Sequence, residues 1–343
     1  MNAALKRLLL ATLTGRRVSR VWAPFMRGRG TIFMLHRFAD PDLGTVGHDP
    51  ATLRAALAYL RRERYDLVSL TELFRRLSDA TPTLDRAIAF TIDDGYLDQA
   101  QVAGPVFAEF DCPVTTFVTS GFLDGTLWFW WDHIEYVFHH TSRVKLDVEL
   151  DSQTVRYNRD PATGYSRAQD DFTVRCKHVP DSEKLEGIRR LARSADVELP
   201  ERPPLRYAPM SWEQLRTLER RGMSFGPHTV THPILARATP DQSRQEIEQS
   251  WQRLTAEAAS PVPVFCYPNG QPQDYGDREI NVLRSLGFDG AVVGTPGYAG
   301  MRDFARPDGA FRVRRFAYSD DIQDLARCAS GLERVSDLVR GVA

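Results

Sequence analysis

The sequence predicts an α/β fold with a parallel sheet, and two observations support this prediction. A short apolar strand at 87–92 ends on two acids and is followed by a helix expected over 98–109, with a possible break at Gly104–Pro105, and a strand over 114–118. Strand, acid-bearing loop, helix, strand is the order of a βαβ unit. The same order of elements returns after residue 207, beyond a tract of different composition. We therefore expect one α/β domain that an insertion interrupts.

Local start and stop signals place the other elements. Residues 31–35 are apolar or β-branched and form a candidate strand that ends at His36. Asp49 and Pro50 have the residue types of an N-cap and a first helical turn. Ser or Thr followed three residues later by Glu or Gln predicts helix starts at Ser69, Ser211 and Thr239. Further strands are expected at 65–68, 223–226, 291–293 and 311–316, and further helices at 278–286 and 319–343.

The tract 128–206 breaks this rhythm and is predicted to be an inserted subdomain. It opens with the aromatic stretch Trp128–His133, and its residues 145–150 alternate like an exposed hairpin strand. The aromatic side chains could stack on sugar rings or anchor the insertion as ordinary core. The predicted organisation is a basic segment 1–30, a main domain 31–318 that contains this insertion, and C-terminal helices 319–343.

Composition narrows the class of protein. Of the 343 residues, 42% are apolar and 26% are charged, which are globular values, and the net charge of −1 gives no argument for nucleic-acid binding. The four cysteines show no paired spacing, which suits a reducing compartment. We therefore expect a cytoplasmic protein.

The first thirty residues carry seven basic side chains and no acid. Their apolar run 8–13 is too short to cross a bilayer, and no clear cleavage site follows it. Basic charge together with Val21, Trp22 and Phe25 suits an anionic membrane surface. The alternative is a basic helix that packs on the protein. On the first interpretation the protein is peripheral at the inner face of the membrane.

The acids Asp93 and Asp94, followed by Gly95, are the first candidate site. Two adjacent carboxylates cannot both ionise cheaply unless something neutralises them, and a metal ion would do so. One Asp could bind the ion while its neighbour accepts a proton from water. The alternative is a turn that caps a helix starting near Tyr96.

A histidine pair, His228 and His232, is the second candidate. A spacing of four residues puts both imidazoles on one side of the chain, and Pro227 and Pro233 argue against a long helix there. Two histidines and one carboxylate form a common catalytic metal set, although two solvated surface histidines would have the same spacing.

Three short motifs resemble those of the polysaccharide deacetylases of carbohydrate esterase family four. Thr91–Gly95 resembles the family's T-F-D-D-G motif, His228–His232 resembles H-[ST]-x-x-H, and Phe265–Gly270 resembles F-R-x-P-Y-G. The resemblance covers residues 31–127 and 207–318. It implies a distorted (β/α) barrel of about seven strands. It also implies a hydrolase that uses a divalent metal, usually Zn²⁺, to remove N-acetyl groups from an amino sugar in a surface polysaccharide or a lipid-linked saccharide.

The resemblance also assigns roles to individual residues. It gives the metal to Asp94, His228 and His232, the general base to Asp93, and substrate and oxyanion contacts to Tyr267, Pro268 and Asn269. A subset of the family carries the acid histidine on the first strand. We assign His36 to that role because no histidine follows His232.

One motif position departs from the family. Cys266 stands where the family has an arginine that pairs with the base, so we expect Arg315, or its neighbour Arg314, to replace it. Two other functions stay open. The chain could be a related amidase or deformylase that acts on a non-polymeric substrate, or a carbohydrate-binding protein with a vestigial site.

Overall fold

The computed structural model describes residues 12–15, 18, 21, 23–79, 84 and 86–340. The chain forms two compact units, the first made of residues 1–124 and 209–343 and the second of residues 125–208. Most of the basic segment 1–30 lies outside the described residues. Within the described part, no helix is long and apolar enough to span a bilayer.

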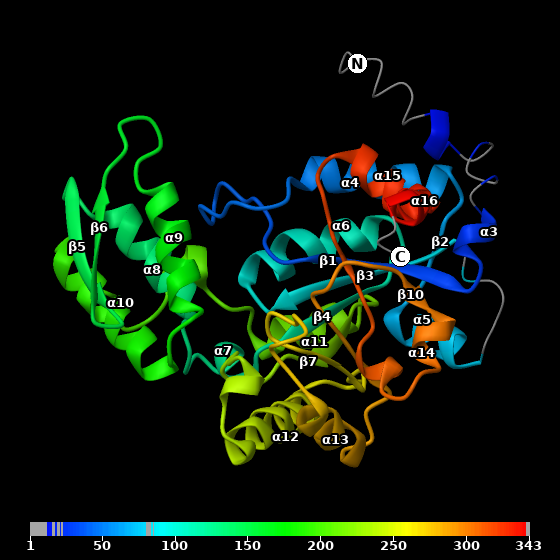
Figure 1. The fold of residues 1–343 in the computed structure, drawn as a ribbon. Coiled ribbons are helices and arrows are strands. Elements are labelled where there is room, and N and C mark those ends of the chain that lie inside the picture. Colours follow the sequence, from blue (N-terminus) through cyan, green and yellow to red (C-terminus); the bar gives the residue numbers. More distant parts are fainter. Residues whose placement is uncertain are drawn as a thin grey trace. The chain divides into compact units, whose positions relative to one another are not determined.

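The first unit is built on a curled, mostly parallel sheet (Figure 1). Its seven strands run in the order β10-β1-β3-β4-β7, with β11 beside β1 and β2 beside β3, and a separate pair β8–β9 is also parallel. Among the strands described in this unit, β10 alone runs antiparallel to its neighbour. The strands are β1 Arg29–Leu35, β2 Asp66–Leu67, β3 Ala87–Asp94, β4 Val114–Val118, β7 Ser224–Pro227, β8 Val264–Cys266, β9 Gly290–Val292, β10 Ala299–Gly300 and β11 Phe316–Ala317. The predicted α/β barrel fold is confirmed.

Helices alternate with these strands in the first unit, and α4 packs against α6 (Figure 1). Their bounds are α3 Ala23–Met26, α4 Pro50–Arg62, α5 Leu70–Ser78, α6 Gly104–Glu109, α7 Ser120–Leu123, α11 Trp212–Glu219, α12 Pro240–Glu257, α13 Asp277–Ser285, α14 Met301–Phe304, α15 Ile322–Ser330 and α16 Leu332–Arg340. The helix expected over 98–109 is continuous. It contains a π-helical stretch, Gln99–Ala103, that runs directly into α6, and the backbone of Ala103 and Gly104 is helical, so the break considered at Gly104–Pro105 does not occur.

Side-chain caps fix several helix starts where the sequence placed them. Asp49 accepts hydrogen bonds from the first turn of α4, and reciprocal capping boxes open α11 at Ser211 and α12 at Thr239. Ser69 also caps α5, but the Glu72 carboxylate instead accepts hydrogen bonds from Arg75 and Arg76. The box expected there is therefore only half formed.

Strand β3 is the centre of the first unit. All eight of its residues are buried, and it pairs with β1, β2 and β4. Alternate residues of a strand point to opposite faces, so a strand packed on both faces is apolar along its length. The carboxylates at its end are thus held by one of the most constrained segments of the fold.

The prediction of one continuous late strand at 311–316 is wrong. The chain forms a short 3₁₀ turn at Gly309–Phe311, a single bridge between Val313 and Val292, and then β11 beside β1. The segment changes partner because it crosses from β9 to β1. Arg315 lies at that crossing.

The second unit has its own apolar core. It contains the hairpin β5 Lys145–Leu150 and β6 Gln153–Asn158, and the helices α8 Trp130–His140, α9 Ser166–Cys176 and α10 Asp181–Ala195. Buried side chains from all five elements form one cluster, which includes Ile134, Phe138, Leu146, Phe172 and Leu191. A separate core of this kind is what an inserted subdomain requires. Of the aromatic stretch, Trp128 and Phe129 are buried.

Candidate active site

The backbone turns sharply where β3 ends. Asp93 and Asp94 are its last two residues, and both are buried. Asp94 has φ of +90° and Gly95 has φ of +99°. The positive φ of Gly95 favours glycine, and a Cβ atom there would also lie 2.6 Å from the Leu123 side chain. Positive φ at an aspartate is uncommon, and such residues concentrate at functional sites.

Asp94, His228 and His232 converge as the motifs predicted. The Asp94 Oδ1 atom lies 3.6 Å from His228 Nε2 and 3.7 Å from His232 Nε2. The three ligand atoms all lie within 4.8 Å of one another, and all three residues are protected from solvent. Ligands about 2.1 Å from a shared ion lie roughly 3.0–3.5 Å apart, so these residues fit one divalent cation.

Burial keeps both imidazoles neutral. It lowers the pKa of His228 to about 4 and the pKa of His232 well below its usual value. His228 follows β7 directly, and its Nδ1 atom lies 2.7 Å from the carbonyl oxygen of Cys266. With Nδ1–H donating there, the Nε2 lone pair faces Asp94. A backbone carbonyl that fixes the tautomer in this way is typical of metal-binding histidines.

The loop between the two histidines is held by Glu246 on α12. Its carboxylate accepts hydrogen bonds from the backbone N–H groups of Val230 and Thr231, both at 2.8 Å, and from the Thr231 hydroxyl at 2.6 Å. Thr229 and His232 both have positive φ, so this loop needs such support. No local sequence pattern marks Glu246, because its partners lie fifteen and sixteen residues away.

Asp93 forms a buried ion pair with Arg315. The guanidinium donates two hydrogen bonds to the carboxylate, at 2.7 and 2.8 Å, and further bonds to the Thr91 hydroxyl and the Val293 carbonyl. Burial alone would raise the pKa of Asp93, but Arg315 outweighs it and holds that pKa well below its usual range. Asp93 is therefore ionised at neutral pH. Of the two arginines considered, Arg315 reaches Asp93, whereas Arg314 is exposed.

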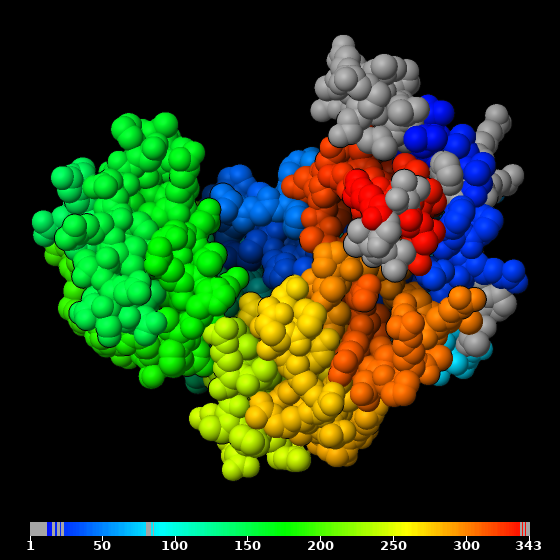
Figure 2. All heavy atoms as spheres, in the orientation of Figure 1, coloured from blue at the N-terminus to red at the C-terminus, as the bar shows by residue number. Residues whose placement is uncertain are grey.

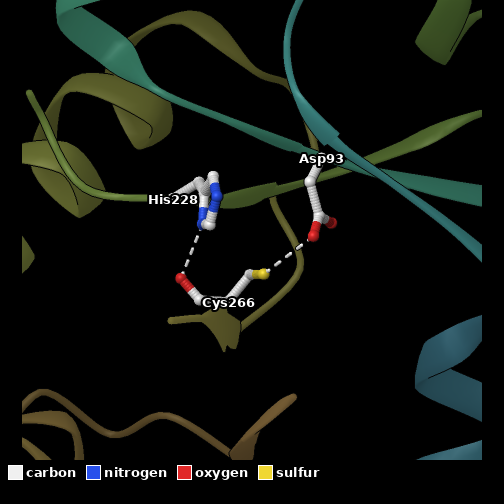
Figure 3. Close-up of side chains that lie close together, drawn as sticks. All are labelled: Asp93, His228 and Cys266. Atoms are coloured by element: carbon white, nitrogen blue, oxygen red, sulfur yellow. Dashed lines mark hydrogen bonds between the residues drawn. The ribbon is translucent and has the colours of Figure 1, made fainter. Parts of the chain in front are cut away.

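Cys266 contacts both Asp93 and His228 (Figure 3). Its thiol lies 3.5 Å from Asp93 Oδ2 and accepts a hydrogen bond from Arg315 at 3.2 Å, while its carbonyl oxygen contacts His228. Burial raises the pKa of this thiol well above its usual value, so it stays protonated and can donate to Asp93. Asp93, His228 and Cys266 also lie within metal-binding distance of one another. A cation between them would be repelled by the Arg315 guanidinium, so this second set does not suit a metal.

His36 lies just beyond the end of β1, on the same side as Asp93. Its Nε2 atom is 3.9 Å from Asp93 Oδ2, and 47% of its side chain is exposed. Gln99 ties the two strand ends together, because its amide donates to the carbonyl oxygens of His36, at 2.7 Å, and Asp93, at 2.5 Å. The Gln99 amide oxygen accepts from the Gly95 N–H group. Sequence reasoning missed Gln99, a buried polar residue four positions after the acid pair's glycine.

The third motif contributes mainly packing in this structure. The Tyr267 ring is buried in an apolar cluster with Phe265 and stacks on Tyr275 at 4.0 Å between ring centroids. Pro268 is buried as well. Asn269 is exposed and has φ of +57°. The Tyr267 side chain is therefore packed in an apolar cluster, whereas the Asp93 carboxylate is paired with Arg315.

Comparisons with known proteins identify the fold. Residues 192–291 match the family model of polysaccharide deacetylase. The Streptococcus pyogenes deacetylase PplD is 17% identical, with a TM-score of 0.57 over 88% of this chain and 99% of that one. IcaB from Ammonifex degensii is 16% identical, with a TM-score of 0.54 over 89% and 98%. No curated protein matches the sequence. The family match and the fold confirm the predicted resemblance.

Proposed function

We propose that this chain, which shares its fold and a family match with polysaccharide deacetylases, is a metal-dependent hydrolase that removes N-acetyl groups from an amino sugar. The expected substrate is a surface polysaccharide or a lipid-linked saccharide. One observation carries the proposal. Asp94 and two neutral histidines, which could hold a cation, adjoin an ionised carboxylate, Asp93, that already has its own counter-ion.

The ligand side of the site would hold the metal. Asp94 supplies a charged oxygen, and His228 and His232 supply neutral nitrogens, which suits Zn²⁺ and related divalent ions. A cation held there supplies a Lewis acid that polarises an amide carbonyl and acidifies water.

The base side of the site, Asp93 with Arg315 and the nearby His36, transfers protons. Asp93 accepts a proton from the attacking water, and the buried Arg315 keeps it ionised and oriented for that step. His36 donates a proton to the amide nitrogen as the C–N bond breaks, so that the sugar leaves as a neutral amine. The exposure of His36 leaves it open to a bound sugar, while its distance from Asp93 keeps the two groups in one pocket.

Acetate release tests this proposal. Asp93→Asn should keep its metal, because Asp93 is not in the ligand set, and should lose roughly 10²–10⁴-fold in turnover, the usual range for a general base. The assay is acetate release from a panel of N-acetylated oligosaccharides, with metal content measured on the same samples. His36→Ala should lower turnover with little change in metal content. Its control is His139→Ala, which changes an exposed histidine of the second unit.

Three outcomes would contradict the assignment. Metal-loaded Asp93→Asn that turns over at the parental rate would remove Asp93 as base. Release of formate but not acetate from small amides would favour a deformylase. Saccharide binding without any hydrolysis, in protein that holds its metal, would favour a carbohydrate-binding protein.

A further inference from the structure

A second concentration of charge lies in the first unit, away from the acids. Five arginines line a cavity of about 660 Å³: Arg29, Arg302, Arg306, Arg314 and Arg334. We call this cavity and the one that adjoins it the basic groove. Its walls are the start of β1, α14 with the turn after it, the segment before β11, and α16. Figure 2 shows the corresponding blue, orange and red surfaces on one face of the first unit.

The positive charge of the basic groove is not balanced by the acids that line it. The two acids are Asp303, which pairs with Arg306 at 3.4 Å, and Glu333, which pairs with Arg327 at 3.0 Å. Among the residues that the structure describes, no acid lies within ion-pair distance of Arg29, Arg302, Arg314 or Arg334. Most of the other arginines that the structure describes do pair with an acid. The net charge of the chain is only −1, so this excess of positive charge is local.

Two further facts show that the groove is short of negative charge. Burial, Arg334 and Arg302 lower the pKa of Arg29, and Asp303 only partly opposes them. Residues 1–39, which include Arg29 and Phe25, contain no acid. Like charges gathered in this way repel one another, and a bound anion would relieve the repulsion.

Apolar side chains stand next to the arginines. The adjoining cavity, of about 550 Å³, is lined by Phe25, Met301 and Leu338 as well as by Arg29 and Arg334. The side chains of Phe25 and Leu338 are each 42% exposed. A site for a soluble anion has no need of exposed Phe and Leu, whereas a membrane surface offers phosphates and an apolar layer together.

The basic groove is distinct from the candidate active site. Arg29 begins β1, and His36 follows its other end, so about 23 Å of extended chain separates them at roughly 3.3 Å per residue. Arg314 and Arg315 are neighbours, yet Arg315 is buried against Asp93 and Arg314 is exposed in the groove. A ligand in the groove would not occupy the catalytic pocket.

We propose that the basic groove binds the phosphate groups of an anionic lipid bilayer, while Phe25 and Leu338 enter its apolar boundary. Guanidinium groups bind phosphate through paired hydrogen bonds, which suits them to this surface. The groove would hold the protein at a membrane and leave the catalytic pocket open. This inference does not depend on the proposed deacetylase activity.

Vesicle binding by the full chain tests the groove. The probe is a phosphatidylcholine vesicle with about one third phosphatidylserine, compared with pure phosphatidylcholine, in a co-sedimentation assay. Each arginine removed near an anionic surface should weaken binding about five-fold, so Arg302→Gln/Arg334→Gln should weaken it roughly 25-fold. Arg167→Gln/Arg202→Gln removes the same charge at exposed positions of the second unit and should bind like the parent. The binding of the parent should also fall as salt is raised.

Separate measurements identify the source of the phosphate and guard against misfolding. Thermal unfolding of both double variants should match the parent, and so should their hydrolysis of soluble substrates. Titration with inorganic phosphate should show weak binding only. The proposal is overturned if the parent binds neutral vesicles as tightly as anionic ones, or if the groove variant binds like the control. Tight binding of inorganic phosphate by a protein that ignores vesicles would also overturn it, in favour of a soluble anion.

Discussion

The two neighbouring carboxylates at the end of β3 are neutralised in different ways. Asp93 is paired with a guanidinium from its own chain, at 2.7 and 2.8 Å. Asp94 faces two imidazoles that burial keeps neutral. The base side of the site therefore carries its counter-ion within the fold, whereas the ligand side presents a negative oxygen and two nitrogen donors that suit a cation from solution.

This difference separates stability from metal binding. Changes on the base side should alter the free energy of unfolding even in metal-free protein, because they disturb a buried ion pair. Changes on the ligand side should act mainly on metal affinity, since the energy of that set is gained only when a cation binds.

The largest effect is expected for Arg315→Met. Removing one partner of a buried ion pair leaves an uncompensated charge and costs about 3–5 kcal/mol of unfolding free energy. Turnover should fall as well, because Asp93 would lose its charge and its orientation. Urea unfolding of metal-free protein measures the first effect, and acetate release measures the second. The double variant Asp93→Asn/Arg315→Met should recover much of the stability and none of the activity.

Arg315→Met should also change how the stability of the protein depends on pH. Arg315 holds the pKa of Asp93 below its usual range, so the stability from this carboxylate is present above the ordinary Asp pKa of about 3.9 and is lost as the pH falls below it. Without Arg315, burial would raise the pKa of Asp93. Protonation of Asp93 would then remove the unpaired buried charge that destabilises the variant. The difference in melting temperature between parent and Arg315→Met should therefore shrink as the pH is lowered from 7 to 4. A constant difference would contradict the assignment.

An intermediate effect is expected on the ligand side, for Glu246→Ala. The loss of three hydrogen bonds to the loop should let His232 move, and residues that orient metal ligands typically change metal affinity 10–100-fold. Metal-free stability should change far less than in Arg315→Met. Competition with a chelator measures the affinity, and Glu248→Ala, two residues further along α12, is the matched control. Equal metal affinity in both variants would reject the role of Glu246.

The sequence predicted the parts of the site that are local and left out those that depend on tertiary contacts. Asp94 and the two histidines stand in short motifs after short strands, and the parallel sheet brings them together. Glu246 and Gln99 act on backbone groups that are remote in sequence or in another strand, so no spacing marks them. Arg314 and Arg315 could not be told apart from the sequence, because their roles depend on which of two alternating side chains faces β3.

The smallest effect is expected for Cys266→Ala, which separates the thiol from the guanidinium. A thiol is a weak hydrogen-bond donor, and its 3.5 Å contact with Asp93 is longer than either contact from Arg315. The variant keeps the Cys266 carbonyl that orients His228, so metal affinity should stay within a few-fold of the parent. Turnover should fall less than about ten-fold, since Arg315 still holds the base. If Cys266→Ala instead matched Arg315→Met in both stability and turnover, the thiol would be the main partner of Asp93. The site could then no longer be divided into a base side that carries its own counter-ion and a ligand side that needs a cation, because Cys266 contacts both sides.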